Sequence, residues 1–405
     1  MKFAELARAG LLVGVCGFTM TVPAVAFAQA QALPERGMPE QAVAPAADGE
    51  EALPAPEEEA KPATDRGEDT TQGNEIVVTA TKREQTLQDV PVAVTVTSAQ
   101  TLERAQIRDL KDLASVVPSL RVNQQQSSAN TNFIIRGFGN GANNAGIEPS
   151  VGVFVDGVYR SRSAAQIGDF PDVQRIEVLR GPQSTLFGKN ASAGVVSVVT
   201  QAPQFKFGGN LEATYGNYDA VVLKGVVTGP VADNVAVSLA GGYNKRDGYI
   251  HDLGTGHTVN DRNRWFVRGQ TLWEASPALR VRIIGDYSRI NENCCAAINL
   301  QPSAATTAIR ALGGKVNNAA DRYADVTYSN FDSTNDIRNW GLSAQADYDL
   351  GPLTFTSITA YRRTDALTNQ DSDFTSADLL GENSQDLRIK TFTQEFRIAT
   401  ISKVR

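Results

Sequence analysis

The 405-residue sequence contains only three cysteines and two histidines. Outside the N-terminal Cys16, the chain has only the adjacent pair Cys294 and Cys295, so no disulfide framework is expected. The sequence leaves open whether this pair forms a vicinal disulfide or remains as two thiols. His251 and His257 are expected in loops, and no histidine adjoins the cysteine pair, so no metal site is predicted.

Recognisable catalytic patterns are also absent. The two histidines suggest no Ser-His-Asp site, and no pair of acidic residues has a glycosidase-like context. The glycine-rich stretch 137–141 does not continue as G-x-G-x-x-G, because position 144 is asparagine. We therefore predict a protein that is not an enzyme and needs no cofactor.

A basic excess is missing from the part of the chain that is expected to fold. The net charge is −7, of which residues 29–73 contribute −8 and residues 1–28 contribute +1. Residues 74–405 therefore carry no net charge. This balance argues against nucleic-acid binding, which needs a basic excess to contact phosphates.

No stretch beyond the N-terminus reaches 18 consecutive apolar residues, so no transmembrane helix is predicted. At the N-terminus, Lys2 and Arg8 precede the apolar run 11–20, and an A-x-A-like site ends at Ala28. This pattern is typical of a secretory signal peptide, residues 1–28, cleaved before Gln29. The sequence thus directs the chain out of the cytoplasm.

Residues 29–73 hold six prolines, ten alanines and the acidic excess. Such a composition buries too little apolar surface to offset the entropy of ordering, so a disordered tether is expected. A short β-prone run follows within segment 74–84: Glu75, Ile76, Val77, Val78, Thr79 and Ala80. An isolated strand of this kind has free backbone groups that can pair with a partner strand.

Residues 85–203 read as a small α+β domain. Short β-prone runs at 91–97, 151–158 and 194–200 are separated by Gly and Pro, and Ser98 or Thr101 is expected to cap a short helix through Leu110.

Residues 204–405 follow a different pattern, in which apolar and polar residues alternate over about ten positions. Leu279, Val281 and Ile283, for example, alternate with Arg280 and Arg282. Aromatic residues near the strand ends and the signal peptide favour a transmembrane β-barrel over the alternative, a soluble β-sandwich. Eight strands are expected near residues 208–215, 218–229, 234–246, 262–274, 278–290, 337–349, 352–364 and 388–400.

The connections between these strands alternate in length. Residues 247–261, 291–336 and 365–387 are long, whereas 229–233 and 275–277 are short. Long external loops and short periplasmic turns are typical of outer-membrane barrels.

From Glu75 to the last residue, the sequence resembles the TonB-dependent outer-membrane receptors. Glu75–Ala80 looks like the TonB box of that family. Further motifs resemble its plug domain and one of its barrel strands: IRGF at 135–138, VDGV at 155–158, RIEVLRGP at 175–182, LFG at 186–188, AGVV at 193–196 and QEFR at 394–397. The implied fold is an α+β plug domain followed by an antiparallel transmembrane β-barrel.

The resemblance implies a function and partners. In such receptors the box pairs as an added strand with TonB, which is energised by an inner-membrane complex. The alternative is that residues 75–80 simply dock onto the plug. The family barrel has about 22 strands, enough to enclose the plug, so the chain is expected to be the front part of a longer, monomeric receptor in outer-membrane lipid.

The implied activity is TonB-energised uptake of a scarce, bulky ligand, foremost a ferric siderophore. Alternatives are uptake of cobalamin or an oligosaccharide, a surface receptor that only binds or signals, and a truncated remnant. The sequence does not name the ligand or the residues that contact it.

The resemblance also implies ionic contacts between plug and barrel. Arg136 and Arg180 each end a plug strand before a glycine, and family plugs use arginines to meet barrel glutamates. Glu395 is the expected partner, because Phe392 and its neighbours occupy the other face of its strand; Glu177 is included in the same set. The alternative is that Glu395 merely lines a watery lumen.

Overall fold

A computed structural model describes residues 77–83, 85–125, 127–140, 144 and 146–400. The predicted signal peptide (1–28) and tether (29–73) lie outside the described residues, as do Glu75 and Ile76 of the predicted box. The described residues fall within one compact unit, residues 71–405. None of the helices among them is both long and apolar enough to cross a membrane.

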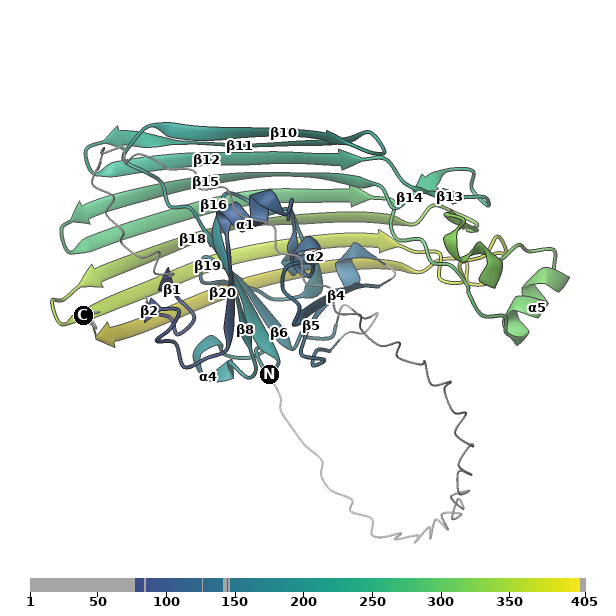
Figure 1. Ribbon diagram of the computed structural model, residues 1–405, viewed down its shortest axis with the longest axis horizontal. Helices are drawn as coiled ribbons and strands as arrows, with labels where there is room; N and C mark the ends of the chain where they lie inside the picture. The colour runs from purple at the N-terminus through teal and green to yellow at the C-terminus, as the bar shows by residue number, and fades with distance from the viewer. Residues whose placement is uncertain (1–76, 84, 126, 141–143, 145, 401–405) are drawn as a thin grey trace, which may run out of the picture. The chain divides into compact units, whose positions relative to one another are not determined.

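The N-terminal described region, which we call the plug domain, has the expected α+β character (Figure 1). Its main sheet has the order β3-β8-β9-β6-β7, in which only the β6–β9 pair is parallel. The elements are β1 (Val77–Val78), β2 (Gln85–Thr86), β3 (Val94–Ser98), α1 (Ala99–Arg104), α2 (Leu110–Leu113), β4 (Leu120–Gln124), the 3-10 helix η1 (Ser128–Asn130), β5 (Thr131–Ile135), β6 (Val151–Val155), β7 (Val158–Arg160), α3 (Ser163–Gln166), β8 (Val173–Arg180), α4 (Ser184–Phe187) and β9 (Gly194–Thr200).

The helices of the plug domain are short, and their ends have local causes. Ser98 caps α1 by accepting a hydrogen bond from the backbone of Thr101, as the sequence predicted. The predicted extension of this helix to Leu110 is wrong, because α1 ends at Arg104 and Gln106 adopts a positive φ of 54°. Asp109 then caps α2, which buries its leucines in the plug core.

The turn between β6 and β7 is dictated by its two residues. Val155 pairs with Val158, and the intervening Asp156 and Gly157 have φ of 48° and 75°. An Asp-Gly pair is favoured in two-residue hairpins that need positive φ at both positions. A Cβ added to Gly157 would lie 3.0 Å from Ile358 Cδ1, so this tight turn also approaches the large sheet closely.

The C-terminal region forms one antiparallel eight-stranded sheet, in the order β10-β11-β12-β15-β16-β18-β19-β20 (Figure 1). The eight predicted strands are confirmed, and most are longer than expected. Within the described residues, no pairing joins the edge strands β10 and β20. The strands are β10 (Gly208–Gly216), β11 (Ala220–Ala232), β12 (Val235–Arg246), β15 (Arg262–Ser276), β16 (Leu279–Glu292), β18 (Thr334–Asp349), β19 (Leu353–Asn369) and β20 (Ser384–Thr400).

Alternation along the strands separates an apolar outer face from a polar inner face. Five aromatic residues follow one another on the outer face of consecutive strands: Tyr243, Trp265, Tyr287, Trp340 and Tyr361. The rings of Trp265 and Tyr287 stack with centroids 5.0 Å apart. Such a row at one level is typical of the aromatic girdle of an outer-membrane barrel.

The three long connections leave the same end of the sheet. They carry β13 (Ile250–Asp252), β14 (Thr258–Val259), α5 (Ala304–Ala311), the 3-10 helix η2 (Ala319–Tyr323) and β17 (Val326–Thr327). Strands β14, β13 and β17 form a separate small sheet, so the loops after β12 and β16 are joined to each other.

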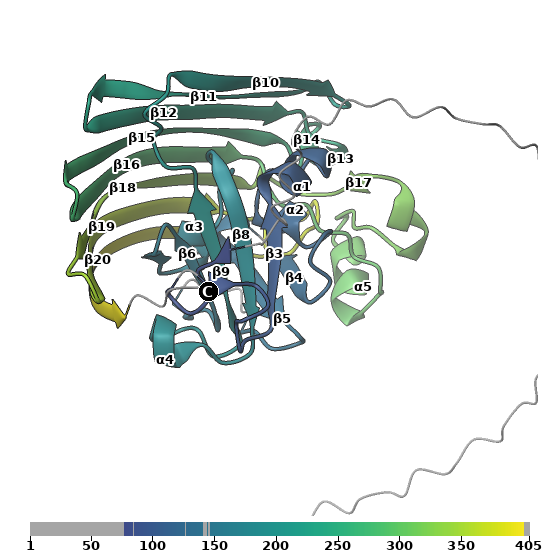
Figure 2. The same ribbon diagram turned by 60° about the vertical axis from the view of Figure 1, so that its left-hand side comes forward.

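The plug domain packs against the inner face of the large sheet (Figure 2). Ala129 and Ala164 of the plug contact Ile290 and Ile337 of the sheet in one apolar cluster. Val158, which follows the Asp-Gly turn, forms a second cluster with residues of β19. These clusters are small, so polar side chains occupy much of the remaining interface.

Candidate functional site

The described part of the predicted box, Val77–Ala80, is called the box segment here. Among the described residues, Val77 and Val78 form β1 and pair only with the two residues of β2. Val78 and Ala80 are fully buried in an apolar cluster with Phe154 and Leu179 of the plug domain. The box segment is therefore docked on the plug, with a short strand pairing and two side chains as its apolar anchors.

A buried carboxylate holds the polar side of the box segment. Glu177 of β8 is fully buried, and its Oε1 accepts hydrogen bonds from the Thr79 backbone at 2.8 Å and the Thr79 hydroxyl at 3.1 Å. Arg175 donates to the same oxygen at 2.8 Å. The second oxygen, Oε2, has no hydrogen-bond partner among the described residues. Glu177 thus contacts the box segment, not the barrel.

Lys82, just after the box segment, reaches the last described strand. Its amine donates to Glu395 of β20 at 2.6 Å and lies 4.9 Å from the centroid of the Phe187 ring. Arg397 donates to the Lys82 carbonyl oxygen at 3.0 Å. Burial lowers the pKa of Lys82, and the hydrogen bond with Glu395 opposes this effect. These contacts connect the chain after the box segment to the barrel.

The Asp-Gly turn supplies the first half of what we call the plug–sheet ionic network. The Asp156 side chain, only 4% exposed, pairs with Arg268 and with Arg282 at 3.6 Å. Thr200 also donates its backbone N–H to this carboxylate at 2.9 Å. Burial acts to raise the pKa of Asp156, but the two arginines and Thr200 outweigh it and lower the pKa.

A second half of the network lies nearer the long loops. Arg264 of β15 pairs with Asp109 at 3.0 Å, with Asp169 at 3.5 Å and with Glu292 of β16 at 2.5 Å. Asp109 is also the N-cap of α2, so one carboxylate both caps the start of a helix and binds the sheet. Burial would raise the pKa of Asp109, but Arg264 and Arg262 lower it overall.

The sequence predicted other plug–sheet ion pairs. Glu395 does face the plug, but it pairs with Lys82 and, within its own strand, with Arg397 at 2.9 Å. Arg136 is exposed in a tight turn between Ile135 and Phe138, and it forms no ion pair within the described residues.

Arg180 is half-buried, and its Nε has no hydrogen-bond partner in the described part of the chain. The structure thus brings neither predicted arginine to Glu395.

Sequence reasoning missed the acidic residues of the network, Asp109 and Asp156. Their partners Arg264, Arg268 and Arg282 occupy inward positions of the alternating strands. An Asp-Gly turn and several inward arginines were the available signals. Their pairing depends on how the plug is placed in the barrel, which no local pattern encodes.

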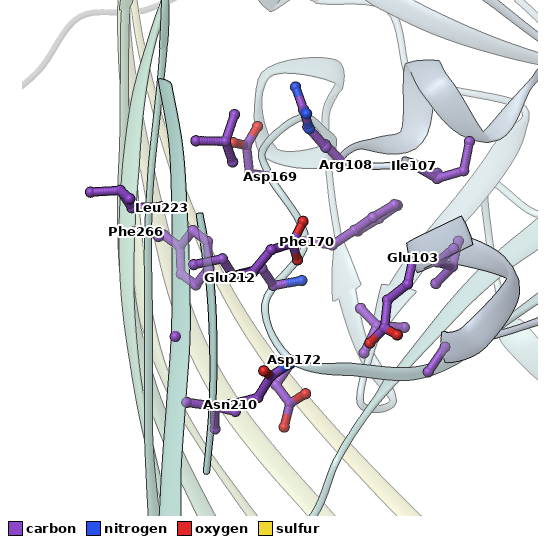
Figure 3. A pocket seen from close by; sticks show the side chains of 18 of the residues that line it. Glu103, Ile107, Arg108, Asp169, Phe170, Asp172, Asn210, Glu212, Leu223 and Phe266 are labelled. Carbon is purple, nitrogen blue, oxygen red and sulfur yellow. The ribbon is translucent and has the colours of Figure 1, made fainter. Parts of the chain in front are cut away.

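A cleft of about 910 Å³, part of it open to solvent, separates α1 and the segment around Phe170 from the first strands of the sheet. Figure 3 shows Glu103 and Asp172 on the plug side and Glu212 on β10. Burial raises the pKa of Asp172, and Lys224 opposes this shift. The cleft carries no group arrangement that resembles a catalytic site.

Comparisons with known proteins agree with this arrangement. A family model described as the TonB-dependent receptor plug domain matches residues 86–195. The match covers most of the α+β domain described above. The α+β domain is therefore a TonB-dependent receptor plug, and the eight-stranded sheet is part of the barrel that follows it. The relatives that the chain matches are receptors and transporters, not enzymes.

Two curated relatives are a pesticin receptor and a vitamin B12 transporter. The pesticin receptor of Yersinia pestis is 32% identical over 161 residues, which cover 40% of this chain and 24% of that protein. The vitamin B12 transporter BtuB of Vibrio vulnificus is 31% identical over 187 residues, which cover 45% of this chain and 30% of that protein. The chain thus matches less than a third of the length of these relatives.

Solved structures share the fold. The ferric yersiniabactin uptake receptor FyuA from Yersinia pestis matches 78% of this chain and 46% of its own, with a TM-score of 0.64 and 21% identity. The ferripyoverdine receptor of Pseudomonas aeruginosa matches 80% of this chain and 41% of its own, with a TM-score of 0.60 and 15% identity. At these identities the likeness concerns the fold alone.

Proposed function

We propose that this chain is the box, plug and first part of the barrel of an outer-membrane receptor that takes up a bulky ligand with energy supplied through TonB. The observation that carries the proposal is the docked box segment. It is bound by a few specific contacts on a plug that is anchored far more firmly to the barrel.

The docking of the box segment supports release and capture by a partner. Its strand pairing involves two residues on each side, so little backbone hydrogen bonding opposes withdrawal. Val77 is 44% exposed, so one face is already accessible. Pairing with a strand of TonB would replace the short β1–β2 pairing with a longer ladder.

Placement in the outer membrane is supported by the surface of the sheet. Large apolar side chains on its outer face are exposed, including Leu211, Leu239 and Phe396. A contiguous apolar face of this kind needs lipid or another apolar partner. We place the long loops outside the cell, the receptor as a monomer in the membrane, and cleavage of the signal peptide between Ala28 and Gln29.

A ferric siderophore is the ligand class that we favour. One similar solved structure is a ferric yersiniabactin receptor and another is a ferripyoverdine receptor. Cobalamin is the second candidate, because a vitamin B12 transporter is among the curated relatives. Uptake of radiolabelled iron as ferric siderophores, compared with uptake of labelled cobalamin by the same cells, separates the two candidates.

Substitution of Val77 tests the coupling. In the complete receptor, Val77→Pro removes the backbone donor of a residue that must pair with TonB, so uptake should fall to the level of a strain without TonB while ligand binding stays intact. The matched control is Val77→Thr, which keeps a β-branched side chain and the N–H, and should transport normally. Normal uptake by the proline variant would refute the assignment of the box.

A further inference from the structure

The adjacent cysteines form a disulfide directly after β16, at the base of a long loop. Cys294 is only 6% exposed. The sequence has no other cysteine outside its N-terminal segment, so no competing pairing exists for these two residues within the described chain. The pair has no part in the docking of the box segment or in the plug–sheet ionic network described above.

The disulfide contacts the plug through two side chains, Gln124 and Ser128, and the Ser128 hydroxyl donates to Cys294 Sγ at 3.6 Å. Gln124, the last residue of β4, points its amide nitrogen at both sulfurs, 2.9 Å from Cys294 Sγ and 3.0 Å from Cys295 Sγ. The same nitrogen lies 3.0 Å from the Ser128 hydroxyl oxygen. One amide therefore joins both cysteines to the end of β4 and to η1.

The backbone of the pair is held by the sheet. The Cys294 carbonyl oxygen accepts hydrogen bonds from Asn335 of β18 at 2.6 Å and from Gln370 at 3.4 Å. Ser128 donates to Glu292 of β16 at 3.1 Å. The cysteine pair thus lies where the plug, the ends of three barrel strands and the long loop meet.

We propose that Cys294–Cys295 is a reversible redox modification site that latches the plug to the base of this loop. A small-molecule thiol attacks one sulfur as its thiolate, forms a mixed disulfide and releases the other cysteine as a thiolate, which takes up a proton. A second thiol resolves the mixed disulfide. The pair gains two electrons and two protons, and the reductant leaves as its own disulfide.

Reduction changes the contact with Gln124 for a geometric reason. Without the covalent bond, van der Waals repulsion separates the two sulfurs, so the two contacts of the Gln124 amide nitrogen cannot both keep their present geometry. The end of β4 and η1 then lose a direct tie to the sheet. Because the plug's hydrogen bonds to the pair come from Gln124 at the end of β4 and from Ser128 of η1, the effect should be confined to β4, η1 and the paired strand β5.

Hydrogen exchange of the complete receptor in detergent tests the latch. Reduction by a trialkylphosphine should add about 2 Da to the peptide that contains the pair, as two hydrogens are gained. It should also speed exchange in peptides from β4 and β5 by about three- to tenfold, while peptides from β9 stay unchanged. Reoxidation should restore the slow exchange. Free thiols in the receptor as isolated would overturn the proposal, and so would unchanged exchange after complete reduction.

Two variants distinguish the latch from a general effect of reductant. Gln124→Ala should exchange more quickly at β4 and β5 in the oxidised form and should respond to reduction much less than the parent, because only the Ser128 contact remains. The double variant Cys294→Ser/Cys295→Ser should behave like the reduced protein with or without phosphine. A full response to reduction in Gln124→Ala would overturn the role of this side chain. These measurements need no transport, so they are independent of the proposed uptake function.

Discussion

The box segment and the Asp-Gly turn of the plug are both attached to their surroundings by carboxylates, but with different strength. The box segment contacts Glu177 through Thr79 and has two buried apolar side chains. Asp156 meets two arginines of the sheet and a backbone N–H, with both Asp156 and Arg268 only 4% exposed.

The difference has a physical consequence. Asp156 would lose two cationic partners if the plug left the sheet, whereas Glu177 keeps Arg175 when the box segment leaves and loses only the two hydrogen bonds from Thr79. The segment that leaves the plug in the proposed mechanism is thus attached weakly, and the turn that stays is attached strongly. Four experiments test this contrast, from the largest expected effect to the smallest.

Asp156→Ala should have the largest effect, because it removes the buried carboxylate that Arg268 and Arg282 share and leaves Arg268 only the more distant Asp286 at 3.7 Å. We expect a loss of about 3–5 kcal/mol in the free energy of unfolding of the plug, measured by denaturant in the complete receptor. The control is Asp365→Ala, which breaks an ion pair on the outer face of the sheet and should cost about 0–1 kcal/mol. Equal losses would remove the contrast between buried and exposed pairs.

Glu177→Gln should loosen the box segment without unfolding the plug. The amide accepts weaker hydrogen bonds than the carboxylate, so docking should weaken by about 1–3 kcal/mol, or about 5- to 150-fold in the population of undocked segment. The readout is the rate of maleimide labelling of a cysteine placed at the buried Val78, in a background without Cys294 and Cys295. Glu103→Gln is the matched control. An unchanged labelling rate would show that Glu177 does not hold the segment.

The partner of Glu395 can be determined with two double-mutant cycles. Glu395→Gln combined with Lys82→Gln should show a coupling of about 0.2–1 kcal/mol, typical of a partly exposed pair. Glu395→Gln combined with Arg180→Gln should be additive in plug-unfolding measurements. Coupling in the second cycle alone would restore the pairing that the sequence suggested.

Asp172→Asn should have the smallest effect, and its sign depends on pH. The raised pKa of Asp172 means that the folded plug favours the protonated carboxyl, so this group stabilises the fold at low pH and loses that contribution as pH rises through its folded pKa. The variant should therefore be slightly more stable than the parent at pH 7, by less than about 0.5 kcal/mol.

Asp156 behaves in the opposite way. Its pKa is lowered, so its stabilising contribution is present above the unfolded pKa of aspartate and is lost as pH falls through the folded pKa.

Unfolding measured against pH should show the Asp172→Asn difference disappearing in acid, where both forms of residue 172 are neutral. If the Asp172→Asn variant were less stable than the parent at pH 7, the ionised Asp172 carboxylate would not be destabilising the folded plug.

Local sequence predicted much of the fold for reasons that are themselves local. The alternation of residues such as Leu279 and Arg280 indicated strands with one apolar face, and eight such strands pair in chain order. Ser98 was one of two candidate helix caps, with Thr101, and the structure selects Ser98, whose side chain accepts from the backbone of Thr101 three positions on. The end of α1 was misplaced, since the positive φ at Gln106 has no clear signal in the sequence.

By itself, then, the sequence determined the strand pattern, the two regions and the motifs of the plug, because each depends on neighbouring residues or on periodicity. Only the tertiary structure decided which charges meet. Glu177 contacts Thr79, 98 positions away, and Lys82 meets Glu395, 313 positions away. Such pairs arise from the placement of the plug against the sheet. A buried charge is stable only beside a partner, wherever that partner lies along the chain.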